Sequence, residues 1–183
     1  MKLKLNPNEI GLLTSLAGST FRYVVGASLQ HELTAAEIYL VTETDAISIR
    51  ATTEEYKFDG EYEDFNRLGI SKASKSKVQR VIEEGELLRK HNGERILAVF
   101  LLQDRINGYL DGNPNFSLES DCGIIFQLES GFIGVYQSDR NLPILEVSYS
   151  DTISLETSPR IESIFEDDIN QKFDYFREVK KIG

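Results

Sequence analysis

Two stretches of the chain alternate apolar and polar residues on both sides of a polar turn, and this pattern most constrains the fold. The first is EIYLVTETDAISIRAT, residues 37–52, and the second is GIIFQLESGFIGVYQS, residues 123–138. Because side chains on a strand alternate between the two faces of a sheet, each stretch predicts an antiparallel hairpin. A chain with two such hairpins must build much of its core from sheet.

The two hairpins lie about half a chain length apart, and an apolar strand precedes each of them, at residues 21–29 and 96–102. We therefore expect a single compact domain, 1–183, with two internal halves, 1–70 and 94–183, that are joined by residues 71–93. The similarity of the two halves has two possible explanations, a true duplication or the resemblance that any two hairpins share, and the sequence leaves both open.

Three segments favour helices. Residues 6–18 begin with a potential cap, Asn6, followed by Pro7 and Glu9, which suit a first turn. Residues 71–94 have helical apolar spacing after a Ser/Lys-rich start. Residues 165–181 place aromatic and aliphatic side chains three or four apart, with acids early and bases late. The predicted fold class is therefore α+β, mainly antiparallel hairpins and meanders with an N-terminal, a central and a C-terminal helix.

The composition excludes several classes of function. Thirty acidic residues against twenty basic ones give 183 residues a formal charge of −10. Such a surface repels phosphate backbones, so we expect no nucleic-acid partner. No apolar run is long enough to span a bilayer and no secretory signal is evident, so we expect no membrane association and a cytoplasmic location. One cysteine and two histidines cannot fill a Cys/His zinc site, and no cofactor motif occurs.

Cys122 is the first catalytic candidate. A thiolate nucleophile needs a lowered pKa, but the neighbouring acids Glu119 and Asp121 would raise the pKa of this thiol. His31 and His91 lie in polar segments that favour loops. We therefore expect a structural cysteine and a protein that is not an enzyme.

Four carboxylates of the second half could converge on a cation. They are Asp111, Asp121, Glu129 and Asp139. The segment DGNPN has turn chemistry but lacks the alternating acids and the distal glutamate of an EF-hand loop. Solvated turn residues are the simpler interpretation, and we predict no metal site.

Residues 54–65 interleave acids with aromatic side chains, a pattern that suits docking to a basic protein. The alternative is an amphipathic strand whose aromatic residues point inward. The predicted partner-binding residues of this segment are Glu54, Glu55, Tyr56, Asp59, Glu61, Tyr62, Glu63 and Asp64. Asp111, Asp121 and Glu129, around the second hairpin, complete the predicted surface.

The small, acidic α+β character and patterns such as DCGIIFQLESG resemble the immunity proteins that neutralise bacterial polymorphic or contact-dependent toxins. The resemblance implies a stoichiometric inhibitor that covers a basic toxin surface, with electrostatic steering of association. Two alternatives remain open: an enzyme or small-ligand-binding domain with a site between the two halves, and a structural or assembly subunit.

Overall fold

The computed structural model describes residues 1–27, 34–58, 61–84, 87–91, 93–138, 142–153 and 171–183. Up to residue 91, the chain contains β1 Lys2–Leu3, α1 Pro7–Thr14, β2 Phe21–Ala27, β3 Thr34–Ala35, β4 Glu37–Thr42, β5 Ala46–Phe58, β6 Glu61–Lys72, α2 Lys75–Glu83 and β7 Leu87–His91. The second half contains β8 Ile96–Leu110, β9 Asn113–Leu128, β10 Phe132–Gln137, β11 Leu145–Ser150 and β12 Gln171–Lys181.

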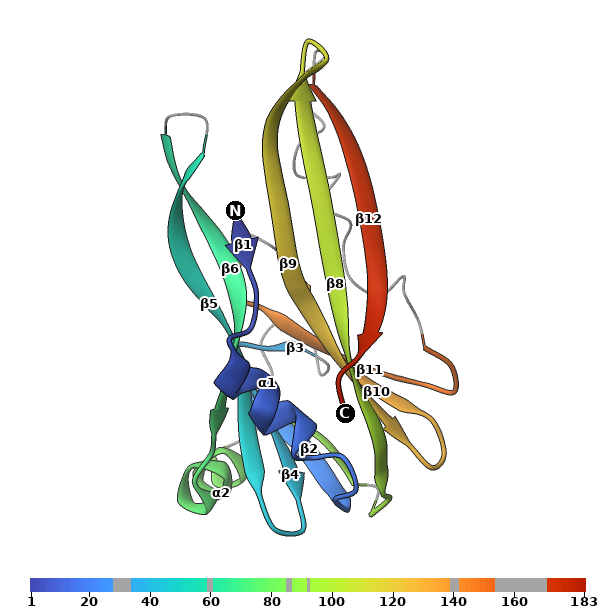
Figure 1. Ribbon diagram of the computed structural model, residues 1–183. Helices are drawn as coiled ribbons and strands as arrows, with labels where there is room; N and C mark the ends of the chain where they lie inside the picture. The colour runs from blue at the N-terminus through green and yellow to red at the C-terminus, as the bar shows by residue number, and fades with distance from the viewer. Residues whose placement is uncertain (28–33, 59–60, 85–86, 92, 139–141, 154–170) are drawn as a thin grey trace.

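The strands form two sheets. The first has the order β6-β5-β4-β2-β7, and the second has the order β12-β8-β9-β10-β11-β3, with β1 paired in parallel to β9. Figure 1 shows the sheets packed together at their lower ends and diverging upward into two separate extensions. Among the described strands of the first part of the chain, β1 and β3 pair with the second sheet.

Both predicted hairpins are confirmed. β4 pairs with β5 and β9 pairs with β10, each in antiparallel register. Ile38 and Ile49 are cross-strand partners in the first hairpin, as are Ile124 and Val135 in the second. All four side chains belong to one buried cluster between the sheets, together with residues of α1 such as Leu13. The alternation in the sequence therefore correctly marks the faces that meet in the core.

The predicted N-terminal helix is α1, and its capping residues act as expected. The Asn6 side chain accepts hydrogen bonds from the backbone N–H groups of Asn8 and Glu9, and the Glu9 carboxylate accepts one from Asn6. Glu9 also accepts the backbone N–H of Ile70 on β6 at 3.2 Å and an ion pair from Arg67. Glu9 thus attaches α1 to β6, at the edge of the first sheet.

The prediction of an α+β fold with three helices is wrong, because the chain is mostly β and the described residues contain two helices. Residues 165–170 of the predicted C-terminal helix lie outside the described residues, and 171–181 form β12. Phe173, Tyr175 and Val179 alternate with exposed residues such as Phe176, which is the period of a strand. Pairing with β8 along the whole length of β12, from Gln171 to Lys181, outweighs the helical spacing of the aromatic residues.

The predicted central helix is α2, which is shorter than expected. The residues after it form β7, which pairs with β2, so the segment predicted to join two halves contributes to the first sheet. The division into duplicated halves stays a prediction.

Two extensions project beyond the shared core. We call residues 51–58 and 61–66 the β5–β6 arm, and residues 103–110, 113–120 and 171–178 the β8–β9–β12 blade. The blade reaches further than the sequence predicts, because β8 continues well past the apolar run that ends at Leu102. Asp111 and Gly112 have φ values of 50° and 81° and form the tight turn at its tip.

Candidate functional site

The β5–β6 arm brings together most of the residues that the sequence predicts for partner binding. Glu54, Glu55 and Tyr56 lie on β5, and Tyr62 and Asp64 lie on β6. Asp59 lies outside the described residues. Glu61 and Glu63 belong to β6, but the structure describes only their backbone.

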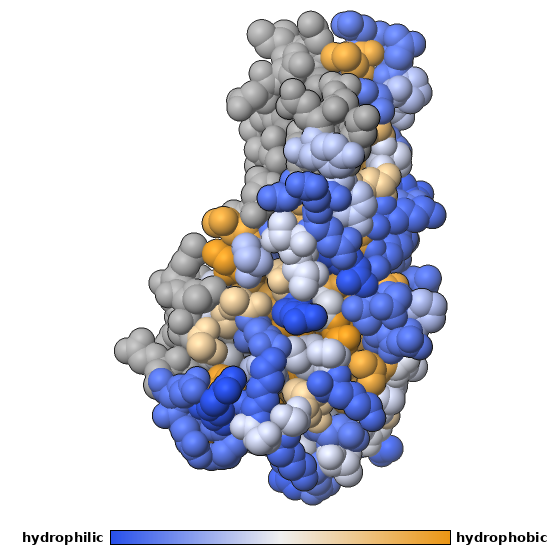
Figure 2. All heavy atoms as spheres, turned by 90° about the vertical axis from the view of Figure 1, so that its left-hand side faces the viewer, coloured by the Kyte–Doolittle hydropathy of each residue, from blue (hydrophilic) through white to orange (hydrophobic). Residues whose placement is uncertain are grey.

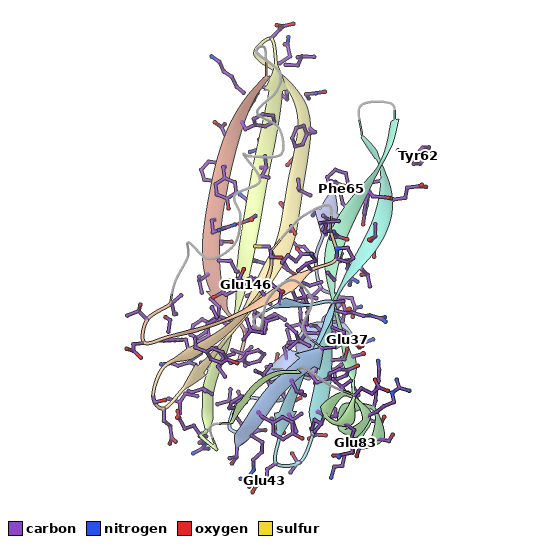
Figure 3. The ribbon with its side chains drawn as sticks, turned by 180° about the vertical axis from the view of Figure 1, so that it is seen from behind. Glu37, Glu43, Tyr62, Phe65, Glu83 and Glu146 are labelled. Atoms are coloured by element: carbon purple, nitrogen blue, oxygen red, sulfur yellow. The ribbon has the colours of Figure 1, made fainter. Side chains whose placement is uncertain are left out.

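The outward side of the arm carries two acidic side chains and an exposed aromatic ring, and the register places Lys57 opposite Tyr62. Glu55 and Asp64 are direct cross-strand partners, and both are exposed. Tyr62 is 69% exposed, the highest value among the large hydrophobic residues that the structure describes. Figure 3 shows Tyr62 on the outer side of the arm, and Figure 2 shows hydrophilic residues over much of this flank of the molecule. Carboxylates facing each other across two strands repel, so this pair destabilises the free arm.

The inward side of the arm is structural. Tyr56 and Phe65 meet edge to face, with ring centroids 6.3 Å apart, and they pack with Leu3, Ile106 and Leu118. The hydroxyl of Tyr56 donates a hydrogen bond to Glu54 at 2.7 Å. The interpretation of inward-pointing aromatic residues therefore holds for Tyr56 and Phe65, but not for Tyr62, which is exposed.

The structure separates the other predicted acids from the arm and from one another. Asp111 is exposed at the tip of the blade, and Glu129 is exposed at the far end of β9. The 16 residues of β9 separate them by roughly 50 Å, from about 3.3 Å per residue. They share no surface with each other, and the turn between β8 and β9, which contains Asp111, lies at the same end of the molecule as the arm (Figure 1).

Asp121 is not on the surface as predicted. It is 1% exposed, and its carboxylate accepts hydrogen bonds from the backbone N–H of Leu5, at 2.8 Å, and from the side chain of Gln103. This carboxylate anchors the segment between β1 and α1 to the second sheet. It is therefore not part of a partner-binding surface.

The interior of the blade contains a charged cluster that the sequence does not reveal. Arg177 donates two hydrogen bonds to the two oxygens of Asp104, at 2.8 and 2.9 Å, and Tyr175 donates a third at 3.0 Å. The side chain of Asp104 is completely buried and that of Arg177 is 7% exposed. Burial alone would lower the pKa of Arg177, but the hydrogen bonds and charge of Asp104 outweigh it and raise that pKa. The cluster fastens β12 to β8.

Cys122 has the structural role that the sequence predicts. It is completely buried, its thiol donates a hydrogen bond to the carbonyl of Leu102 at 3.4 Å, and it packs with Ile125 and Tyr136. His31 lies outside the described residues, and of His91 only the backbone in β7 is described.

A hollow of about 360 Å³ lies on the outer face of the first sheet, beside α2. Its apolar lining comes from Tyr23, Val41, Ala46 and Val78, and its charged rim from Arg22, Glu43, Asp45 and Lys75. Arg22 and Glu43 form an ion pair. The hollow is large enough for a small molecule, but it lies on one sheet and not between the two halves.

No helix among the described residues combines the length and the apolar character that a membrane crossing requires. Comparisons with known proteins find no matching family model, and no curated protein or solved structure with significant similarity to the chain.

Proposed function

We propose that this chain is a protein-binding module of the cytoplasm that inhibits a basic partner, in the manner of an immunity protein, by covering the partner's surface with the β5–β6 arm. One observation carries the proposal: the exposed ring of Tyr62 stands next to the opposed carboxylates of Glu55 and Asp64. Neither carboxylate has an ion-pair partner among the described side chains.

Each part of this surface suits a basic protein partner. Aromatic side chains supply binding energy at the centre of interfaces, and carboxylates steer the approach of lysine and arginine. A cation placed between Glu55 and Asp64 would relieve their repulsion, so the arm gains stability when the partner binds. The net charge of −10 accelerates the encounter with a basic surface.

Affinity capture with matched variants tests this function. The protein and its Tyr62→Ala variant are used to capture partners, with Phe176→Ala as control because Phe176 is also exposed, at 59%, but lies on the blade. We expect the protein and the control to retain one basic partner, and Tyr62→Ala to lose it. Equal capture by all three, or a captured partner without a basic surface, would contradict the proposal.

The inhibitory role needs a separate measurement. If the captured partner is toxic when expressed alone, co-expression of this chain should restore growth, and co-expression of Tyr62→Ala should not. If the activity of the partner is unchanged in the complex, the chain is a binding module but the proposal that it acts as an inhibitor is wrong.

The hollow beside α2 favours a second candidate function, the binding of a small molecule of mixed polarity. Val41→Trp would fill its apolar lining. If a small ligand is the physiological partner, this change abolishes ligand binding, while Tyr62→Ala has no effect on any activity of the chain.

A further inference from the structure

We infer that the partner contributes an extended basic segment that pairs, as an added strand, with the free edge of β5 between Ala51 and Glu55. This inference rests on the proposed function and names the way in which the arm is recognised. It depends on the direction of backbone groups, on exposure and on charge.

At the base of the arm, the pairing between β4 and β5 ends, and β5 and β6 continue into the arm. β4 pairs with β5 only as far as Glu37 and Arg50. Just before Glu37 the chain has crossed to the second sheet, where Thr34 and Ala35 pair with β11. Beyond Arg50, no described strand lies beside β5 on the side away from β6.

The register of β5 shows which backbone groups point to this open side. At the start of the strand, the carbonyl of Asp45 accepts the N–H of Thr42 and so faces β4, while the carbonyl of Ala46 accepts the N–H of Ala73 and faces β6. Successive residues of a strand alternate in this direction, and the pairing of β5 with β6 runs without a bulge. Odd-numbered residues therefore face away from β6, which assigns Ala51, Thr53 and Glu55 to the open edge.

The β6 edge supports the same alternation. The N–H of Ile70 points away from β5, since it donates to Glu9 of α1. Ile70 is the register partner of Ile49, which faces β4. α1 thus protects the lower edge of β6, whereas no described element protects β5 beyond Arg50.

The charges at the open edge specify the segment that fits it. Glu54 and Glu55 are adjacent in sequence, so their side chains lie on opposite faces of β5. An added strand would meet a carboxylate on each face and would best carry two consecutive basic residues there. Beside Ala51 and Thr53, whose side chains are small, β-branched residues suit an added strand. The same acids oppose pairing between two copies of this chain, because like charges would face each other.

Amide hydrogen exchange with a defined probe tests the inference. The probe is the peptide acetyl-Thr-Val-Thr-Val-Arg-Arg-Thr-amide, and its control carries Glu-Glu in place of Arg-Arg. We expect the basic peptide to slow exchange at the amides of Thr53 and Glu55 by about tenfold or more, and the acidic peptide to have no effect. Protection should decrease as the salt concentration rises.

Two variants separate hydrogen bonding from simple charge attraction. Thr53→Pro removes one outward N–H without breaking the pairing with β6, whereas Thr53→Val keeps this N–H. Both variants lose the hydrogen bond from the Thr53 hydroxyl to Asn66, so they are matched in that respect. We expect Thr53→Val to bind the peptide as the parent protein does and Thr53→Pro to bind about tenfold more weakly.

The outcomes distinguish the two proposals. If the peptide shifts the resonances of Glu55 and Asp64 but leaves the Thr53 and Glu55 amides unprotected, strand addition is wrong and the acidic docking surface stands. If the peptide shifts none of these resonances, both proposals are contradicted. Protection that rises with protein concentration in the absence of peptide would instead show that two copies of the chain pair at this edge, and would overturn the inference.

Discussion

The β5–β6 arm and the β8–β9–β12 blade both extend beyond the shared core, but different interactions hold them. The blade has three strands, the buried ion pair between Asp104 and Arg177, and a contact between Phe116 and Phe173 with ring centroids 5.9 Å apart. The arm has two strands and exposes two opposed carboxylates. Because an isolated two-stranded ribbon is marginally stable in water, the arm depends on contacts at its base and on the packing of Tyr56 and Phe65 with Leu3, Ile106 and Leu118. The blade therefore has more stabilising side-chain contacts, and the arm has the more exposed surface, including Tyr62.

The largest expected effect is on the blade. Asp104→Ala leaves the Arg177 guanidinium buried without its partner, which should lower the free energy of unfolding by about 3–5 kcal/mol. Denaturant unfolding measures this loss. Arg105→Ala is the matched control, because Arg105 is the next residue on β8, its side chain is 56% exposed, and its ion pair with Glu119 is long, at 3.7 Å. The control should change stability by less than about 1 kcal/mol. A loss below about 1 kcal/mol for Asp104→Ala would show that the cluster does not hold the blade.

The next effect is at the base of the arm. Glu9→Gln keeps the shape of the side chain but removes the charge that binds Arg67 and the Ile70 N–H, and should cost about 2 kcal/mol. Amide exchange should also become faster along β6. Glu84→Gln removes an exposed carboxylate that pairs with Arg80 on α2 and should cost less than about 0.5 kcal/mol. Equal losses of stability for the two variants would show that the contacts of Glu9 on α1 do not support the arm.

A smaller effect of opposite sign is expected on the arm itself. Glu55→Lys replaces a repulsive cross-strand pair with an attractive one, so the free energy of unfolding should rise by about 0.5 kcal/mol. The gain should vanish at high salt. Glu83→Lys makes the same change of charge on α2 and serves as control. A Glu55→Lys variant that is less stable than the parent protein would show that the opposed carboxylates do not repel.

The smallest effect concerns pH and the attachment of α2 to the first sheet. Burial opposes ionisation of Glu37, but hydrogen bonds from Ser48, Tyr39 and Lys77 outweigh burial and lower the pKa of this carboxyl below its ordinary value of 4.5. The unfolded chain therefore binds the proton more readily than the folded chain. The resulting stability is present above the ordinary pKa of glutamate and is lost as the pH falls through the lowered pKa.

A Glu37→Gln variant lacks this contribution. Between pH 7 and pH 3, it should lose less stability than the parent protein, as measured by denaturant unfolding at each pH. Identical pH dependence of the two proteins would show that the network around Glu37 does not favour its charged form.

The sequence predicts the parts of the fold that local patterns determine. Alternating residues correctly indicate both hairpins, and Asn6, Pro7 and Glu9 correctly indicate α1. The error at the C-terminus arises because the spacing of Phe173 and Phe176 is compatible with a helix, while the strand β12 depends on a partner far away in the chain. Pairing with the edge of β8 favours the strand over the helix, and the sequence around residues 171–181 does not indicate that this edge is available.

The site is predictable to a similar extent. The acidic and aromatic composition of residues 54–65 indicates the arm, but the sequence does not show that Tyr56 and Tyr62 have different environments. Asp104 and Asp121 are both buried, and their hydrogen-bond partners Arg177 and Leu5 lie 73 and 116 residues away in the sequence. A buried acid with a distant partner cannot be distinguished from a surface acid by its neighbours in sequence.

The dissociation constant of the captured partner for two charge-matched variants tests the central claim most directly. Glu55→Lys/Asp64→Lys changes the arm, and Glu83→Lys/Glu84→Lys makes the same change of net charge on α2. We predict that the arm variant binds about 100-fold more weakly than the parent protein and that the α2 variant binds within about threefold of it. Equal weakening by both variants would show that only net charge matters, and would contradict a binding surface on the β5–β6 arm.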